Sequence, residues 1–299
     1  MGFFSMSQTF SRLNFNYKTK RNTPKTEYLL NKNTPFDVAE AFRNLKAALS
    51  VSVPKQEGGV VIEMTSAYPE EGKTTVSVNL ALMFALSNAK VLLIDADIRK
   101  GRVAKYFKTK PVPGLSDYLS GLVELDDAIH TSRINKNLSF ITCGTHSPRP
   151  YELLESDEAQ NMIKELKKRY DYIFIDTPPM LLISDALALT PVTDGAVLVC
   201  RHMSSYISDI SRALSTLRFA KANILGVVVN DYNVPQAKKS GNGYTKKYYY
   251  YSYEYNNKED ETVDTGAPDQ PQIPADPAAK TQKTQYAPDE QSAKKKQHQ

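Results

Sequence analysis

The sequence predicts a doubly wound α/β domain with a mostly parallel sheet and a phosphate-binding loop. Three observations lead to this fold class. Short runs rich in β-branched residues alternate with helical patterns between residues 60 and 230. The first run leads into a Gly-Lys-Thr turn, and acidic residues follow two of the later runs. Runs that are apolar throughout are typical of strands buried on both faces, as in a parallel sheet covered by helices.

The overall composition fits one such domain. The 299 residues are 41% hydrophobic, which is enough for a sizeable core and excludes a wholly disordered chain. The formal net charge of +5 is too small to indicate a nucleic-acid binder. Cys143 and Cys200 lie far apart, so neither a disulfide scaffold nor a cysteine metal site is expected. The longest uncharged run, 74–89, is shorter than a membrane-spanning helix, and we expect a cytoplasmic protein.

Three regions follow one another along the chain. Residues 1–33 hold six basic residues and one acid, which predicts a basic arm that is solvated or attracted to a membrane surface or a partner. An amphipathic helical pattern begins near Thr34 and opens the ordered domain, 34–236. Residues 237–299 are rich in Tyr and then in Pro, Gln, Asp and Lys, which predicts a disordered tail.

Six strands are expected within the domain. Each is a short apolar run, and the segments between most of them are long enough for the crossover helices that parallel strands need. The runs are 60–64, 91–94, 138–142, 172–175, 196–200 and 224–229.

The strongest chemical signal is the turn after the first strand. Strand, turn and a helix expected to open at Val76 follow in the order of a phosphate-binding loop. Its backbone N–H groups would wrap the β-phosphate of ATP, Lys73 would offset the β/γ charge, and the Thr74 hydroxyl would ligate Mg²⁺. We expect the Lys73 side chain to face solvent in the empty site. The residues assigned to nucleotide binding are Pro69, Glu70, Glu71, Gly72, Lys73, Thr74 and Thr75.

Two residues depart from the loop pattern G-x-x-x-x-G-K-[ST]. Ala67 replaces the first glycine, and Glu70 stands where many such loops carry another glycine. A side chain at position 70 restricts φ and adds negative charge near the phosphates. The sequence therefore predicts a weakened nucleotide affinity unless Glu70 points to solvent.

Carboxylates follow two further strands. Asp95 and Asp97 follow the run 91–94 at alternate positions, so both are expected on one face at the carboxyl edge of the sheet. Asp176 follows the run 172–175 and is expected at the same edge. Acids at this edge can hold Mg²⁺ and accept a hydroxyl proton.

The roles of these charged residues are only partly set by their spacing. Asp95 and Asp176 are expected to hold the metal together with Thr74, and Asp97 is the simplest general base, although spacing leaves the identity of the base open. Arg99 and Arg102 follow directly and would either bind phosphate or the acceptor, or lie in a solvated loop.

Together the motifs resemble the deviant-Walker P-loop NTPases, and in particular the bacterial tyrosine kinases of capsule and exopolysaccharide synthesis. The similarity covers about residues 34–256. Residues 66–75 resemble the Walker A motif, 94–99 the additional Walker A′ motif of this family, and 175–179 the Walker B motif. The resemblance implies ATP- and Mg²⁺-dependent protein-tyrosine autophosphorylation, with Lys73, Asp95, Asp97 and Asp176 as the catalytic residues.

Two further segments gain a role from this resemblance. Glu40, Arg43 and Lys46 look like the oligomerisation helix of the family, Glu-x-x-Arg-x-x-Arg, with Lys46 in place of the last arginine. Seven tyrosines within twelve residues look like its C-terminal autophosphorylation site, phosphorylated between subunits; an unmodified aromatic tail is the alternative. They are Tyr244, Tyr248, Tyr249, Tyr250, Tyr251, Tyr253 and Tyr255.

The resemblance also implies partners. It makes the chain the cytoplasmic kinase half of a two-protein system, assembled as a homo-oligomeric ring. A separate transmembrane activator, the polysaccharide co-polymerase, would recruit it to the inner face of the cell membrane. A cognate tyrosine phosphatase and other protein substrates are further implied partners, and nucleic acid is not.

Two other functions stay open from the residues alone. A partition or septum-positioning ATPase would carry an extra lysine early in the loop, where this chain has Tyr68, Pro69, Glu70 and Glu71. The second function is a non-catalytic adaptor that is switched by nucleotide binding, which the presence of Glu70 in the phosphate-binding loop suggests. An iron-sulfur relative would need paired cysteines, which the sequence lacks.

Overall fold

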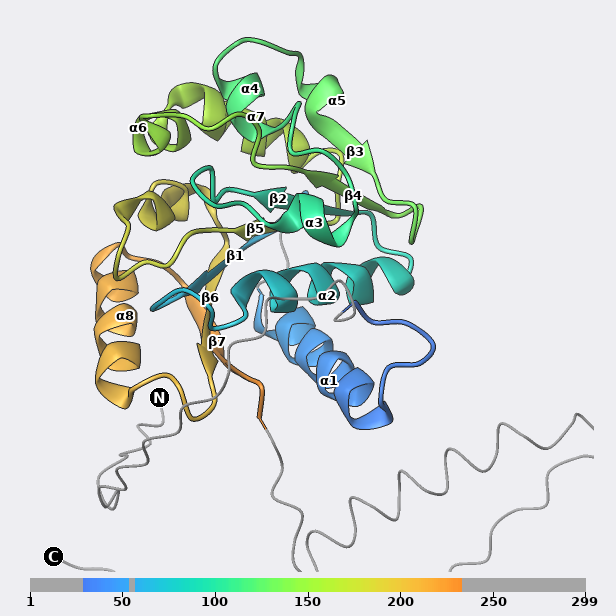
Figure 1. Ribbon diagram of the computed structural model, residues 1–299, viewed down its shortest axis with the longest axis vertical. Helices are drawn as coiled ribbons and strands as arrows, with labels where there is room; N and C mark the ends of the chain where they lie inside the picture. Colours follow the sequence, from blue (N-terminus) through green and yellow to red (C-terminus); the bar gives the residue numbers. More distant parts are fainter. Residues whose placement is uncertain (1–28, 54–56, 233–299) are drawn as a thin grey trace, which may run out of the picture. The chain divides into compact units, whose positions relative to one another are not determined.

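The computed structural model describes residues 29–53 and 57–232 (Figure 1). Most of the predicted basic arm and the whole of the predicted tail, with its tyrosine cluster, lie outside the described residues. Leu29 and Leu30 were assigned to the arm by the sequence pattern, but both pack against the core, and the N–H of Leu30 donates to Asn79 Oδ1 over 2.8 Å. The folded chain therefore starts upstream of Thr34.

The described residues form a seven-stranded sheet in the order β3-β4-β2-β5-β1-β6-β7. Neighbouring strands are parallel, except that β3 is antiparallel to β4. The six predicted strands are confirmed to within two residues at each end, whereas β3 was missed because three residues are too few to show a period. The strands are β1 (Val60–Ser66), β2 (Val91–Asp95), β3 (Ile129–Thr131), β4 (Leu138–Ile141), β5 (Tyr172–Asp176), β6 (Gly195–Arg201) and β7 (Ile224–Asn230).

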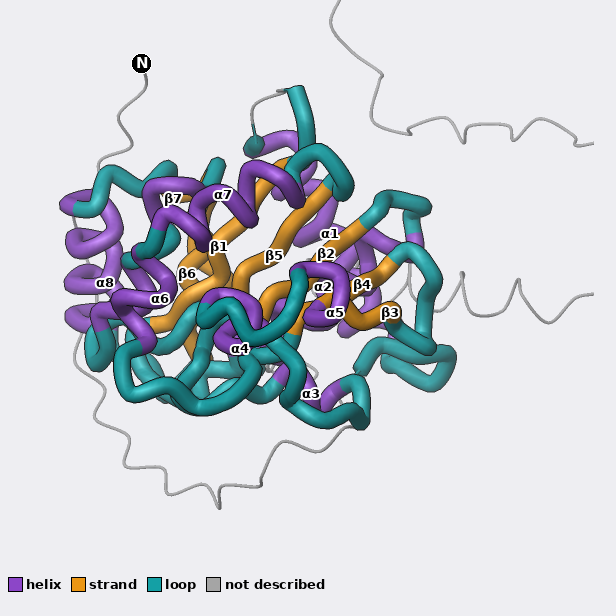
Figure 2. Tube along the Cα trace, turned by 90° about the horizontal axis from the view of Figure 1, so that it is seen from above, coloured by secondary structure: helices purple, strands orange, loops and turns teal. Residues whose placement is uncertain are grey.

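Helices cover both faces of the sheet, which confirms the doubly wound α/β class (Figures 1 and 2). On one face α2 (Lys73–Leu86) lies against the strands and α1 (Phe36–Ser52) packs on α2. The opposite face carries α4 (Leu115–Leu119), α6 (Pro150–Glu155), α7 (Asp157–Leu166) and α8 (Ile207–Phe219). The shorter elements are α3 (Val103–Tyr106), α5 (Leu125–Ala128) and the 3₁₀ turns η2 (Ser184–Leu187) and η3 (Thr190–Val192).

The core lies in two layers because successive side chains of a strand point to opposite faces. Ile62 and Met64 of β1 pack with Phe84 of α2, and Val61 of the same strand packs with Ile163 of α7. Each of these side chains is almost fully buried, and burying one contributes about 1.5–3 kcal/mol. The strand ends that carry the functional residues are therefore held by packing on both sides.

Helix α2 begins at Lys73, three residues before the predicted start at Val76. Its N-cap is Gly72, whose φ of +86° lies in the left-handed region. A Cβ atom at Gly72 would lie 1.8 Å from Nδ2 of Asn230, so a side chain there would be strained at this φ and would displace the Asn230 amide. A glycine cap gives no side-chain signal, and the sequence therefore did not reveal that Lys73 and Thr74 are helical.

Within the described residues, no helix combines the length and apolar character needed to cross a bilayer.

Candidate active site

The strand order brings the phosphate-binding loop and the acids to one place. Strand β5 lies between β1 and β2, so Asp176 is in register with Asp95 on one side and with Met64 on the other. The loop that follows β1 leads directly into α2 at this same carboxyl edge. The expectation that Asp95 and Asp176 share one edge with the loop is therefore confirmed.

Lys73 does not face solvent, and that expectation was wrong. Its side chain is 8% exposed, and Nζ lies 2.9 Å from Oδ1 of Asp176. Two hydroxyls complete the surroundings of this carboxylate. Thr74 Oγ1 donates to Oδ2 over 2.7 Å, and Ser77 Oγ donates to Oδ1 over 2.9 Å. The buried Asp176 thus neutralises the lysine and positions it at the start of α2.

Asp95 is the least satisfied acid of this group. Its Oδ2 accepts the N–H of Val103 over 2.9 Å, while its Oδ1 is buried with no hydrogen-bond partner in the described part of the chain. Burial raises the pKa of Asp95 above its ordinary value, and the nearby carboxylate of Asp176 raises it further. A bound cation would stabilise the charged form of such a carboxylate.

These oxygen donors fit a magnesium ion. Mg²⁺ prefers oxygen ligands and is usually held by one or two carboxylates together with water and substrate phosphates. Across residues 29–53 and 57–232, no group of three or more His, Cys, Asp or Glu side chains is arranged to hold a metal by itself. The remaining ligands would thus come from the nucleotide and water.

Asp97 lies two residues beyond the end of β2, in a loop. Its Oδ1 accepts the N–H of Lys100 over 2.9 Å. Partial burial raises the pKa of Asp97, and the charges of Lys73 and Asp176 also act on it, in opposite directions. The structure therefore places Asp97 in the same electrostatic cluster as the other three predicted catalytic residues.

Glu70 points to the surface and adopts a conformation that suits glycine. Its side chain is exposed, and its φ of +67° lies in the left-handed region that favours glycine. The backbone of this loop thus keeps the geometry of a glycine-rich turn although the glycine is absent. The replacement costs the folded loop about 1 kcal/mol of strain.

Replacing Glu70 with glycine is expected to stabilise the chain by about 1 kcal/mol in chemical denaturation, because it relieves this strain. Glu70→Ala is the matched variant, because it removes the carboxylate but keeps a Cβ atom at positive φ. Both changes are expected to leave the affinity for ATP nearly unchanged in a calorimetric titration, since the exposed Glu70 side chain points to the surface and not toward the phosphates. Equal stability of the two variants would contradict the strain argument.

The Glu71 side chain holds the loop in shape. It is buried, its Oε2 accepts the N–H of Tyr68 over 2.9 Å, and its Oε1 is hydrogen-bonded to Ser205 Oγ. Asn230 Nδ2 donates to the carbonyl of Glu71 over 3.1 Å. The side chain and the carbonyl of Glu71 thus bind other groups of the protein, and its backbone N–H is the group left for a nucleotide.

The sequence did not predict the residues that support the phosphate-binding loop. Ser205 and Asn230 follow β6 and end β7, more than a hundred residues after the loop they contact. Arg201 also supports the loop, because it donates to the carbonyl of Glu70 over 3.4 Å. It forms an ion pair with Asp231 at 2.7 Å. No motif marks these residues, because the contacts depend on β6 lying beside β1 and on β7 lying beside β6.

Other predicted residues are committed to contacts within the chain. Thr75 Oγ1 is hydrogen-bonded to the hydroxyl of Tyr106 in α3 at 2.6 Å. Arg99 is not free in a solvated loop, because its Nε is 2.7 Å from Oδ2 of the buried Asp185 in η2. Arg99 therefore ties the loop after β2 to η2.

The predicted oligomerisation residues lie along α1. Glu40 and Arg43 form an ion pair with each other. The ammonium group of Lys46 is hydrogen-bonded to Ser87 Oγ and lies 5.8 Å from the centroid of the Phe84 ring. Within one chain Lys46 therefore links α1 to α2, while Glu40 and Arg43 pair within α1, and the contact of these residues with another copy stays a prediction.

Comparison with known proteins agrees with this geometry. Residues 55–224 match the family model described as an AAA domain. The chain is 38% identical over 175 residues to tyrosine-protein kinase CpsD of Streptococcus pneumoniae serotype 4, covering 58% of this chain and 77% of that protein. It is 31% identical over 221 residues to tyrosine-protein kinase ptk of Acinetobacter johnsonii, covering 74% of this chain.

The lengths of these relatives differ. The match covers only 29% of ptk, so this chain spans less than a third of that protein.

Among solved structures, the kinase domain of Escherichia coli tyrosine kinase ETK is 31% identical to this chain with a TM-score of 0.64. The match covers 77% of this chain and 89% of that domain.

Proposed function

Because the chain belongs to the AAA domain family and, within it, to the tyrosine-protein kinases, we propose that it transfers the γ-phosphoryl group of ATP to protein tyrosine. We propose that this activity controls capsular or exopolysaccharide synthesis and export. One observation carries the proposal: the buried pair of Lys73 and Asp176 meets Asp95 and Asp97 at the mouth of the phosphate-binding loop. These groups suit phosphoryl transfer, which relies mainly on positioning and charge neutralisation.

ATP would bind over the amino end of α2. The N–H groups of the first helical turn and the ammonium group of Lys73 would contact its phosphates. Thr74, Asp95 and Asp176 would hold Mg²⁺, which when bound offsets negative charge on the phosphates. Lys73 would exchange part of its contact with Asp176 for contact with phosphate oxygens.

Asp97 is the proposed general base. As the tyrosine oxygen bonds to the γ-phosphorus, the bond from that phosphorus to ADP breaks, and the phenol proton passes to the Asp97 carboxylate. A carboxyl whose pKa is raised by burial binds this proton more readily than an exposed one. Asp95 and Asp176 are the proposed metal ligands, so Asp97 is the acid of the cluster that is left to accept the proton. Its Oδ2 would take the proton, because Oδ1 accepts the N–H of Lys100.

The acceptors and partners are also proposals. We propose that the seven tyrosines between positions 244 and 255 are phosphorylated by a neighbouring copy, and that Glu40, Arg43 and Lys46 contribute to a ring. A transmembrane polysaccharide co-polymerase would activate the kinase and recruit it to the cell membrane, and a tyrosine phosphatase would reverse the modification. The names of CpsD and ETK as tyrosine kinases support the reaction, and they do not identify these partners.

The test is to follow phosphate from γ-labelled ATP, with Mg²⁺ present and with or without the cytosolic segment of the activator. The expected result is label on tyrosine in the full chain, increased by the activator segment. Release of inorganic phosphate without protein label would contradict the kinase and favour a positioning ATPase. Nucleotide binding with neither label nor release would favour a non-catalytic adaptor.

A further inference from the structure

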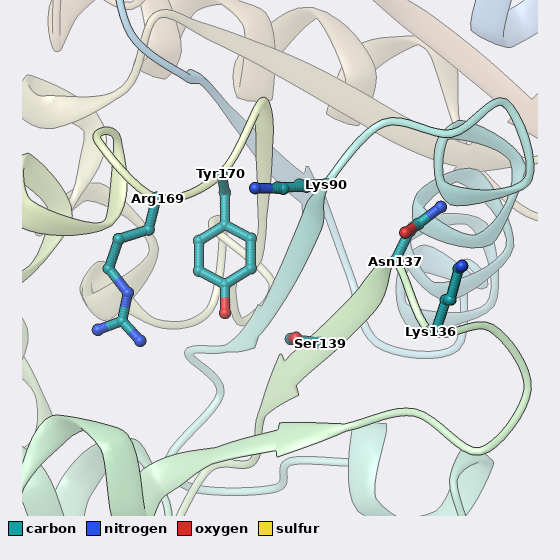
Figure 3. A pocket seen from close by; sticks show the side chains of 6 residues that line it. All are labelled: Lys90, Lys136, Asn137, Ser139, Arg169 and Tyr170. Carbon is teal, nitrogen blue, oxygen red and sulfur yellow. The ribbon is translucent and has the colours of Figure 1, made fainter.

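A basic pocket lies at the opposite edge of the sheet from the phosphate-binding loop. It is lined by residues that precede or begin β2, β4 and β5, which is the amino edge, and its volume is about 260 Å³ (Figure 3). The figure shows the Tyr170 ring and the Ser139 side chain near the middle, between Arg169 on one side and Asn137 on the other. The lining residues are Lys90, Lys136, Asn137, Ser139, Arg169 and Tyr170.

The charge of this pocket is positive and only partly balanced. No acidic residue lines it. Arg169 is held by Asp126 at 2.6 Å and by Glu165 at 3.4 Å. The ammonium groups of Lys90 and Lys136 form no ion pair in the part of the chain that the structure describes.

The pocket therefore presents two ammonium groups without an ion-pair partner among the described residues. The carboxylate of Asp171 lies close to Lys90, because its Oδ2 accepts the backbone N–H of Lys90 over 2.7 Å. Ser139 and Asn137 add hydroxyl and amide groups, and Nδ2 of Asn137 also donates to the carbonyl of Ala85 over 3.5 Å.

These groups suit a phosphate monoester attached to a ring. A phosphate monoester carries about −1.5 to −2 charges at pH 7 and three acceptor oxygens, which match two ammonium groups and the hydroxyl and amide donors of Ser139 and Asn137. Tyr170 offers an aromatic wall against which a second ring can pack. The volume lies below the roughly 300–1,000 Å³ of pockets for drug-sized ligands, which favours one modified side chain over a whole nucleotide.

We propose that this pocket binds phosphotyrosine, and that its source is the C-terminal tyrosine cluster of another copy of the chain. The source rests on the proposed kinase function, whereas the recognition rests on the pocket itself. Phosphorylation at the active site, on the carboxyl edge of the sheet, would thus create a ligand that binds in the pocket at the amino edge. The kinase product would be held away from the site that made it.

The test measures binding without requiring kinase activity. N-acetyl-phosphotyrosine amide is titrated by calorimetry into the full chain with its seven clustered tyrosines changed to phenylalanine, so that no internal ligand forms. The double variant Lys90→Gln/Lys136→Gln is expected to bind at least tenfold more weakly. The matched control is Lys164→Gln/Lys221→Gln, which removes the same charge from exposed positions outside the pocket and is expected to bind as the parent does.

Three outcomes would overturn the proposal. They are an absence of saturable binding, equal weakening in the control variant, and inorganic phosphate binding as tightly as the phosphotyrosine compound, which would indicate an unselective anion site. Circular dichroism of both variants checks that the fold is retained. A chain without kinase activity that still binds the compound through Lys90 and Lys136 would reject the proposed function and leave the pocket assignment standing.

Discussion

Lys73→Met is expected to abolish tyrosine phosphorylation and also to destabilise the chain. Losing the cation that faces the transferred phosphoryl group is expected to lower the rate by at least about 10²–10³-fold, as for other single groups that stabilise transition-state charge. The same change leaves Asp176 buried without its ion-pair partner. Breaking a buried pair from one side costs about 3–5 kcal/mol. Labelling with γ-labelled ATP and chemical denaturation measure the two effects.

Two further variants separate the catalytic loss from the structural one. Lys73→Met/Asp176→Asn removes the orphaned charge and is expected to recover most of the stability while staying inactive. Lys73→Arg keeps the positive charge but changes the shape of the side chain. It is expected to keep most of the unfolding free energy and to lose most of the tyrosine phosphorylation. Tyrosine labelling by a folded Lys73→Met chain would refute the assignment of the phosphate-binding loop. A normal unfolding free energy for Lys73→Met would refute the importance of the buried pair.

The sequence was sufficient for the fold class because its strands are apolar on both faces. Runs such as 91–94 and 172–175 have no polar side to suggest an exposed sheet, and each is followed by an acid. That pattern also predicted that Asp95 and Asp176 lie at one edge. The strand order could not be predicted from the sequence. The two acids are in register because β5 lies between β1 and β2.

What the sequence missed are contacts between distant segments. The burial of Lys73 follows from its pairing with Asp176, 103 positions later, and the support of the loop by Ser205 and Asn230 follows from the position of β6 and β7. Local patterns do not reveal such pairs, because nothing in a motif states which strand lies next to it. The basic pocket was missed for the same reason, since its residues come from three separate strand starts.

If phosphate is transferred between subunits, a chain without kinase activity is expected to be phosphorylated by an active chain that lacks the tyrosine cluster. An inactive Lys73→Met chain with an intact tail is mixed with an active chain whose seven clustered tyrosines are changed to phenylalanine. The tail composition predicts a random coil, and about twenty residues of coil span roughly 22–27 Å, at about 5–6 Å times the square root of the length. That reach is comparable with a domain radius, so the tail is expected to be long enough to enter the active site of an adjoining copy.

The design distinguishes transfer between chains from transfer within one. A size tag on the inactive chain identifies the labelled species, and each chain incubated alone should show no label on the tyrosine cluster. The stabilised Lys73→Met/Asp176→Asn chain serves as a second acceptor, so poor folding of the first cannot hide a positive result. Label that appears only when Lys73 and the tyrosines share one chain would refute transfer between subunits. Label on the tagged acceptor would mean that the flow of phosphate depends on the contact between copies, which connects the oligomer to the activity.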